Sequence, residues 1–507
     1  MARDNRAGVF VDLASVTAPF LMGMGWGNRR RNRADVFVDR GSGLRGWKVR
    51  LSAGRPLATP AIADGRLFLG GGFGTYDFYA LDAIEGRILW RHRTSDDGPT
   101  AAVVEDGLVA YNTESCTLEI LTTEGKSVWQ LWLGDPLLSM PAICAGRVYM
   151  AYPDSRRDHQ HYLACFDLRS GALMWRHPII CDVITAPVVQ DGLVYASCMD
   201  GTVFCLSSED GKCVWQRAMR ATSAPTVVAG EIFVSQRHDD PQYGVRERWI
   251  RQRHERAARA RETREASVAR GKTGRAIASA AETGLEVSEP HSEVLFECQE
   301  FCAHLDLEAK RRTAEYRSYM HMDASVGFAA APAAAKFHYA AMHLGVDRVS
   351  AAWGFQGSRP CVYQGRLYAA SGRWLRCLRL QNDFAKPQDQ LVWEFDVYRA
   401  ARLAEGTFVP TVTPPVVLND RVIVGSAAGD LFCLDAENGE VLWHVHLGEP
   451  ISYQPAVAYG RVYVPTATGL LYALETGSDA DDGWYMWGAN AAHTNSVSPE
   501  CEFVHAV

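Results

Sequence analysis

The chain has 507 residues, of which 47% are hydrophobic and 22% charged, and 52 Lys and Arg against 59 Asp and Glu give a formal net charge of −7. This composition is typical of a soluble globular protein, and the slightly acidic balance gives no reason to expect nucleic acid as a partner. No stretch reaches the roughly 18 clean apolar residues of a membrane-spanning helix, so we expect no membrane span.

Residues 1–35 precede any repeat and form an N-terminal extension. Arg3 and Arg6 stand before a mostly apolar run, but Asp12 interrupts it and no small-residue cleavage site follows, which argues against a signal peptide. The 13 cysteines are an odd number, and most lie in predicted strands at core positions. Buried free thiols favour a reducing compartment, so we predict a cytoplasmic protein, with a periplasmic or secreted protein as the alternative.

The clearest repeat unit is Gly192–Trp215, with the sequence GLVYASCMDGTVFCLSSEDGKCVW. It contains three short runs of β-branched and aromatic residues separated by Asp, Gly and Ser, and a fourth run, Pro187–Gln190, precedes it. These runs predict an antiparallel four-stranded meander that ends on a tryptophan. A sheet this small needs copies of itself as neighbours to bury its faces.

Copies of this unit recur along the chain, most of them at intervals of 39 to 50 residues. We predict that the tryptophan of each copy packs in the seam between two blades, because indole is large and its N–H needs one acceptor. These blade-docking tryptophans are Trp47, Trp90, Trp129, Trp175, Trp215, Trp353, Trp393 and Trp443. The predicted fold is all-β, an eight-bladed β-propeller of four-stranded antiparallel blades.

The two ends of the repeat region predict how the ring closes. Residues 36–240 contain a lone final strand at Trp47, then blades one to four and the start of the fifth, and residues 337–475 contain the end of the fifth blade to the eighth. Because the last blade lacks a fourth strand, the Trp47 strand is predicted to complete it; a strand at Trp484 is the alternative. Residues 476–507 are predicted to pack on the ring as a tail.

One interval, from Trp215 to Trp353, is 138 residues long. Residues 241–336 are therefore predicted to be a helical, partly basic insertion in the fifth blade. Residues 242–275 are rich in Arg, Ala, Glu and Gln, which are good helix formers. Loops of a rigid scaffold are where function is commonly added, so the insertion is where we look for it.

The repeat text of Tyr79–Trp90 (YALDAIEGRILW) and Leu431–Trp443 (LFCLDAENGEVLW) resembles the tryptophan-docked repeat of the pyrroloquinoline-quinone-like propellers. The resemblance covers residues 43–240 and 345–475 and implies the propeller fold. That superfamily includes quinoprotein alcohol dehydrogenases and the scaffold lipoprotein of the outer-membrane assembly machinery. The ending Trp484–Asn495 (WYMWGANAAHTN) also resembles a tag that often flanks these propellers.

The resemblance does not carry the quinone chemistry. Quinoprotein alcohol dehydrogenases typically hold a disulfide between two adjacent cysteines over the cofactor, and this chain has no Cys-Cys pair. We therefore place the chain in a non-enzymatic, bacterial-type branch of the superfamily and expect no cofactor. The sequence also contains no nucleophile elbow, P-loop or dinucleotide fingerprint.

The segment His291–His304 (HSEVLFECQEFCAH) is a candidate metal site. On a helix, Cys298 and Cys302 would face the same way, with His304 beside them. Thiolate and imidazole ligands suit Zn or Cu. The alternative is that both cysteines lie on the apolar face of a core helix.

The second candidate site is the basic run over residues 246–275, with eleven Lys or Arg against four Glu. One helical face of this run is predicted to bind a partner protein, through Trp249, Arg251, His254, Arg261 and Arg264. The alternative is a solvated helix without a partner.

Taken together, these features predict a non-catalytic propeller scaffold that mediates protein–protein interaction or assembly. The helical insertion is its predicted partner-binding element. The alternative is a quinone- or metal-dependent oxidoreductase that uses the axial funnel of the propeller.

Overall fold

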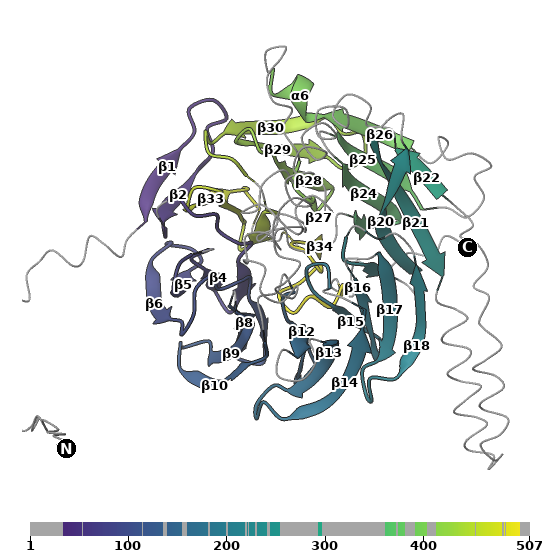
Figure 1. Cartoon of the computed structure of the whole chain (residues 1–507). Helices are drawn as coiled ribbons and strands as arrows, with labels where there is room; N and C mark the ends of the chain where they lie inside the picture. Colours follow the sequence, from purple (N-terminus) through teal and green to yellow (C-terminus); the bar gives the residue numbers. More distant parts are fainter. Residues whose placement is uncertain are drawn as a thin grey trace, which may run out of the picture.

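The computed structural model describes residues 34–253, 293–296, 360–402 and 412–496, apart from short gaps within these ranges. Its described strands form eight antiparallel sheets that stand around an axis as in a propeller (Figure 1). Within each sheet the strands run from the axis to the rim, in the order in which the chain reaches them for most of the ring.

Sheets 1 to 4 each contain four strands that follow one another along the chain. Sheet 1 contains β3 (Ala61–Ala63), β4 (Arg66–Gly70), β5 (Asp77–Asp82) and β6 (Ile88–Arg93). Sheet 2 contains β7 (Val103–Glu105), β8 (Leu108–Asn112), β9 (Thr117–Thr122) and β10 (Ser127–Trp132). Sheet 3 contains β11 (Ala142–Cys144), β12 (Arg147–Asp154), β13 (Gln160–Asp167) and β14 (Leu173–Ile179). Sheet 4 contains β15 (Val188–Gln190), β16 (Leu193–Ser197), β17 (Thr202–Ser207) and β18 (Cys213–Ala218).

Sheets 5 to 8 complete the ring, and two of them gain a fifth strand from a distant part of the chain. Sheet 5 contains β19 (Thr226–Val228), β20 (Glu231–Asp240), β21 (Gly244–Arg253) and β22 (Glu293–Phe296). Sheet 6 contains β23 (Pro360–Tyr363), β24 (Arg366–Ser371), β25 (Trp374–Arg379) and β26 (Leu391–Asp396), and the short helix α6 (Val397–Ala400) follows it. Sheet 7 contains β27 (Val416–Leu418), β28 (Arg421–Gly425), β29 (Asp430–Asp435), β30 (Val441–His446) and β34 (Gly483–Trp484). Sheet 8 contains β31 (Ala456–Ala458), β32 (Arg461–Pro465), β33 (Leu470–Glu475), β2 (Arg45–Arg50) and β1 (Asp35–Val38).

The turns between the first two strands of the sheets follow directly from the sequence. In sheet 1 the two turn residues, Asp64 and Gly65, have φ angles of 49° and 72°. Asp106 and Gly107 occupy the same place in sheet 2, with φ angles of 50° and 74°. Two consecutive positive φ angles define the type I′ hairpin turn, and the Asp-Gly pair is a favoured sequence for it.

Five of the blade seams are built from a tryptophan of one sheet and a glycine of the next. Trp175 of β14 lies over Gly211, in the last turn of sheet 4, so closely that a Cβ on Gly211 would lie 2.4 Å from the indole ring. The Trp175 Nε1–H donates to the Ser208 carbonyl at 3.0 Å. Four more pairs repeat the close approach of ring and glycine: Trp47 with Gly86, Trp90 with Gly125, Trp129 with Gly171, and Trp393 with Gly439.

The ring closes where the two ends of the repeat region meet. β2, which carries Trp47, pairs antiparallel with β33 over five residues, from Gly46 opposite Leu474 to Arg50 opposite Leu470. Trp484 lies elsewhere, in β34, which pairs with β27 at the inner edge of sheet 7. Closure by a segment from the other end of the chain pairs the edge of β33, which would otherwise be exposed.

The predicted fold, an eight-bladed propeller of four-stranded blades with a helical insertion in the fifth blade, is wrong in the strand number of its blades and in the helical insertion. Sheets 7 and 8 have five strands each. The described parts of the expected insertion, β21 and β22, are strands, and β21 pairs with β20 from Glu231 opposite Arg253 to Asp240 opposite Gly244. An available partner strand outweighs the helix propensity of the Arg- and Glu-rich sequence, because propensity is a weak preference that tertiary pairing overrides.

Candidate functional site

The predicted partner-binding and metal residues fall mostly outside the described part of the chain. Trp249 and Arg251 lie on β21, whereas His254, Arg261 and Arg264 lie outside the described residues. The candidate metal ligands Cys298, Cys302 and His304 are also outside them. Within the described residues, no group of three or more His, Cys, Asp or Glu side chains could hold a metal ion.

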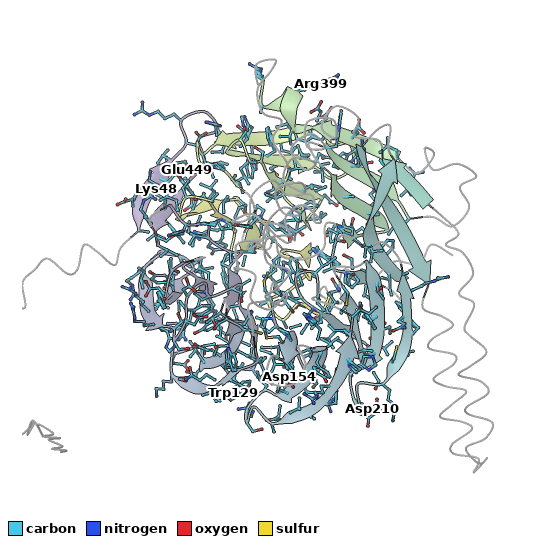
Figure 2. All side chains as sticks on the ribbon, viewed as in Figure 1. Lys48, Trp129, Asp154, Asp210, Arg399 and Glu449 are labelled. Carbon is cyan, nitrogen blue, oxygen red and sulfur yellow. The ribbon has the colours of Figure 1, made fainter. Side chains whose placement is uncertain are left out.

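The blade-docking tryptophans are placed by the structure at the outer strands of the sheets. Trp90, Trp129 and Trp393 each donate their indole N–H to a carbonyl of the following sheet, at 3.0, 2.9 and 3.0 Å. Trp215 lies on β18 and Trp443 on β30, while Trp353 lies outside the described residues. Figure 2 shows Trp129 near the rim of the ring, away from the axis.

The C-terminal segment 483–496 occupies the axis of the ring. Its strand β34 lies close to the centre of the molecule (Figure 1). Its backbone also accepts hydrogen bonds from the inner strands of three more sheets: Tyr485 O from Val457 N at 3.0 Å, Ala491 O from Val104 N at 3.0 Å, and Ala492 O from Ile143 N at 3.3 Å. Together with β27, these contacts join the segment to sheets 2, 3, 7 and 8.

Two tryptophans anchor this axial segment. Trp484 is 2% exposed and Trp487 is 1% exposed. Trp487 belongs to a buried cluster of small and apolar residues that lead into the first strands of sheets 1 to 5, namely Ala58, Ala101, Met140, Ala186 and Ala221. Full burial of a large apolar side chain contributes about 1.5–3 kcal/mol, so the axial segment is a packed part of the core rather than a loose tail.

A buried histidine stacks on this anchor. The rings of His493 and Trp487 are 3.6 Å apart with an interplanar angle of 22°, and His493 is 1% exposed. Burial lowers the pKa of His493 to about 3, so its ring is neutral at neutral pH. Among the described residues, His493 Nδ1 and Trp487 Nε1 have no hydrogen-bond partner, which adds to the cost of charging this site.

The most buried carboxylate of the described residues accepts several hydrogen bonds, which indicates a structural role. Glu119 of β9 is 2% exposed and accepts hydrogen bonds from Tyr111 Oη at 2.8 Å and Ser95 Oγ at 3.3 Å. His92 Nε2 lies 3.2 Å from the same carboxylate. Burial alone would raise the pKa of Glu119, but these partners outweigh it, and the pKa lies below its usual value. A carboxylate kept ionised by several partners is a poor general acid.

A second polar cluster joins two strands of sheet 7. Asp430 of β29 is 3% exposed, and its Oδ1 lies 2.8 Å from His444 Nε2 and 2.9 Å from His446 Nδ1. Sheet 1 has an ion pair at the corresponding strands, where Arg91 binds Asp77 through Nε and Nη2 at 2.7 and 2.6 Å. The recurrence of the pairing in two sheets indicates a structural link between third and fourth strands.

The outer strands present apolar side chains to solvent. The largest exposed fractions on the rim belong to Val36 of β1 at 82%, Ile180 after β14 at 59%, and Val38 of β1 at 52%. Leu442 of β30 is 51% exposed. Exposed apolar residues on the edge of a sheet mark a place where another chain can add.

Family membership follows from the sequence match of the repeats. The family model described as outer membrane protein assembly factor BamB matches residues 32–157, 159–289 and 382–501, well over half of the chain. The chain belongs to this family. The resemblance to the pyrroloquinoline-quinone-like repeat superfamily is thereby confirmed.

Two relatives of this family illustrate the extent of the similarity. The outer membrane protein assembly factor BamB of Yersinia pestis is 27% identical over 178 residues, which cover 32% of this chain and 44% of the relative. The protein of the same name from Shewanella oneidensis is 30% identical over 131 residues, which cover 25% of this chain and 31% of the relative. The chain thus spans less than half of the length of these relatives.

Three solved structures match this chain over most of its length. The computationally designed Ika8 protein has a TM-score of 0.50 at 10% identity, with 88% of this chain and 99% of that chain covered. BamB from Moraxella catarrhalis has a TM-score of 0.49 at 15% identity, with coverage of 84% and 96%. A quinohemoprotein alcohol dehydrogenase from Pseudomonas putida HK5 has a TM-score of 0.47 at 12% identity, with coverage of 88% and 79%. At 10% identity, the match to the designed protein is a likeness of fold alone.

The predicted cytoplasmic location is wrong. The family and its relatives are named as outer membrane protein assembly factors, which contradicts a cytoplasmic assignment. The cysteines misled the prediction because a buried thiol behaves as a small apolar side chain, whatever the redox state around the protein. Seven of the nine described cysteines are buried. None of the helices in the described residues is long and apolar enough to cross a membrane.

Proposed function

We propose that this chain is a non-catalytic propeller scaffold that binds protein partners in the assembly of outer-membrane proteins. Membership in the BamB family and the names of the relatives support this function. The family model matches the repeats at residues 32–157, 159–289 and 382–501, so the function is carried over with the ring of sheets and not with a catalytic motif.

The observation that carries the proposal is the filled axis. The chain's own segment 483–496 binds the inner strands of four sheets with buried Trp484 and Trp487 at its centre. An oxidoreductase that used the axial funnel would need this space for its substrate. With the axis packed, the surfaces left for recognition are the rim and the loops, which suit protein partners.

The assembly function can be tested by complementation. The full chain is expressed in a bacterium whose own BamB gene is deleted, and the amount of folded outer-membrane β-barrel protein is measured. We expect the chain to restore part of that amount. Equal expression of the chain with no restoration would overturn the proposal.

The insertion remains the proposed partner-binding element, now without its helical assignment. Because β21 and β22 complete sheet 5, a deletion of residues 241–336 would remove half of that sheet. The sharper variant deletes residues 255–291 and joins the two strands with a short Gly-Asn-Gly linker, which suits a hairpin turn. We expect this variant to keep its melting temperature and to lose complementation. Full complementation by the shortened chain would remove the insertion from the proposal.

A further inference from the structure

The outermost strand of sheet 8, β1, has one paired edge and one open edge. Its four residues pair with β2, from Asp35 opposite Lys48 to Val38 opposite Arg45. In the sheet order β1 is terminal, so within the described residues no strand covers its other edge. β1 stands at the periphery of the ring (Figure 1), and Lys48 of the neighbouring β2 marks the same part of the rim in Figure 2.

The hydrogen-bonding pattern of this hairpin shows which backbone groups of β1 face outward. Asp39 N donates to Leu44 O at 2.9 Å, so these residues form a hydrogen-bonded pair next to the turn. In an antiparallel ladder hydrogen-bonded pairs alternate with non-hydrogen-bonded ones. The register therefore directs the N–H and C=O groups of Phe37 toward β2 and those of Val36 and Val38 toward the open edge.

Apolar side chains flank the open edge. The side chains of Val36 and Val38 are 82% and 52% exposed. Between them, Phe37 turns to the other face and meets Tyr472 of β33 edge to face, with ring centroids 5.2 Å apart. A strand already fixed in the extended conformation loses little further entropy when another strand adds to it.

Charge near one end of β1 defines the chemistry of the strand that would fit. Arg40 and Arg45 are both exposed, and neither forms an ion pair within the described residues. Asp39 lies at the same end, where Ser42 N and Ser42 Oγ both donate to its carboxylate, so the two arginines leave this end with a net positive charge. Arg45 lies directly opposite Val38 in the register. An incoming strand with acidic side chains at this end and apolar residues at alternate positions would complement both features.

We propose that β1 is a docking strand for an extended, acidic–apolar segment of a partner protein, which adds to the open edge of sheet 8 as a further strand. This inference rests on the proposed scaffold function and names a second surface, separate from the insertion, through which the scaffold binds a partner. A second copy of the chain is the other candidate occupant of this edge, and the light-scattering measurement described below distinguishes it from a partner protein.

The test uses the purified full chain and a fluorescein-labelled peptide, Glu-Glu-Val-Thr-Val-Thr-Val, with Lys-Lys-Val-Thr-Val-Thr-Val as its charge-reversed twin. Binding is measured by fluorescence anisotropy. We expect saturable binding of the acidic peptide and weaker binding of its twin, with a difference that shrinks at high salt. The Val36→Pro/Val38→Pro variant removes two outward N–H donors and should weaken the acidic peptide about tenfold or more. The matched Val36→Thr/Val38→Thr variant keeps the donors and should weaken it less.

A charge-reversal variant tests the proposal independently of the proline substitutions, which can disturb folding. Arg45→Glu should reverse the preference, so that the basic peptide binds more tightly than the acidic one. The proposal is overturned if the acidic peptide does not bind, if the proline variant binds it as the parent does, or if Arg45→Glu leaves the preference unchanged. Light scattering of the chain without peptide tests whether a second copy occupies this edge. If the parent chain is a dimer and the proline variant is a monomer, the partner of β1 is a second copy and the proposal is overturned. Because only purified components are used, a negative result here leaves the complementation test of the scaffold function intact.

Discussion

The seam between sheets 3 and 4 gives the sharpest test of how this ring is held together. Gly211 has a φ of +69°, and a Cβ placed on it would lie 2.4 Å and 2.6 Å from two ring atoms of Trp175. Gly146, in the first turn of sheet 3, has a φ of +70°, but nothing lies within 4 Å of its Cβ position. The two glycines thus share a backbone conformation and differ in whether an indole covers them.

The comparison separates two free-energy costs of an alanine substitution, namely backbone strain and steric overlap with the indole ring. At Gly146 the left-handed backbone costs an L-residue about 1–2 kcal/mol, and the smaller entropy of the unfolded chain offsets up to about 1 kcal/mol of it. At Gly211 the same strain applies, and the overlap with Trp175 adds about 1–3 kcal/mol. Displacement of the ring would also weaken its 3.0 Å hydrogen bond to Ser208 O, which is worth about 1 kcal/mol. Gly211→Ala should therefore destabilise the chain by about 2–5 kcal/mol, against about 1 kcal/mol for Gly146→Ala.

Urea unfolding followed by circular dichroism measures both variants against the parent chain. We expect a clearly lower midpoint for Gly211→Ala than for Gly146→Ala, with similar slopes. Equal midpoints for the two variants would refute the idea that close docking of tryptophan on glycine stabilises the seam. Trp175→Phe, which keeps an aromatic ring but loses the N–H donor, should lie between the parent and Gly211→Ala.

Three further predictions concern a buried histidine, a buried carboxylate and an exposed thiol. Burial lowers the pKa of His493 from 6.5 to about 3, so between these values the unfolded chain binds a proton that the folded chain does not. The free energy of unfolding should therefore fall as the pH falls through that window, by at most about 1.4 kcal/mol per pH unit. Thermal melts at several pH values should show a smaller dependence of stability on pH for a His493→Asn variant. Glu119→Ala would leave the Tyr111 hydroxyl buried without its acceptor, so calorimetry should show a loss of about 1–3 kcal/mol in the free energy of unfolding. The double variant Glu119→Ala/Tyr111→Phe should recover part of this loss, and no recovery would contradict the coupling between the two residues. Cys213 is the exposed thiol among the described cysteines, so brief alkylation of the folded chain and peptide mapping should label it before Cys433, and the reverse order would contradict the burial of Cys433.

The sequence predicted most of the ring because each repeat carries its own local signals. Asp-Gly pairs encode the inner hairpin turns through their tolerance of positive φ, as at Asp64 and Gly65. The alternation of apolar residues encodes the strands, and the spacing of the tryptophans encodes the period at which sheets repeat. These signals act over a few residues, so they can be read without knowledge of the neighbours.

Predictions that depended on a distant partner fared less well. The Arg-rich stretch at the start of the expected insertion was assigned to a helix, whereas Gly244–Arg253 pairs with β20 over its whole length. Its composition favours a helix, but the long edge of β20 offers a ladder of backbone hydrogen bonds that composition cannot reveal. The location was misjudged for a related reason, since a cysteine in a core strand carries no information about the compartment.

The amino-acid sequence by itself determined the repeat, its turns and the family, because those depend on residues close together in the chain. The tertiary structure alone decided what fills the centre and what is left open at the edge. Trp487 and His493 stack at the axis because several inner strands enclose one shared, buried space. Val36 and Val38 stay exposed because ring closure uses β2 and leaves β1 with no further strand to pair with among the described residues. Both outcomes depend on where the chain meets itself after several hundred residues, and no local pattern records that.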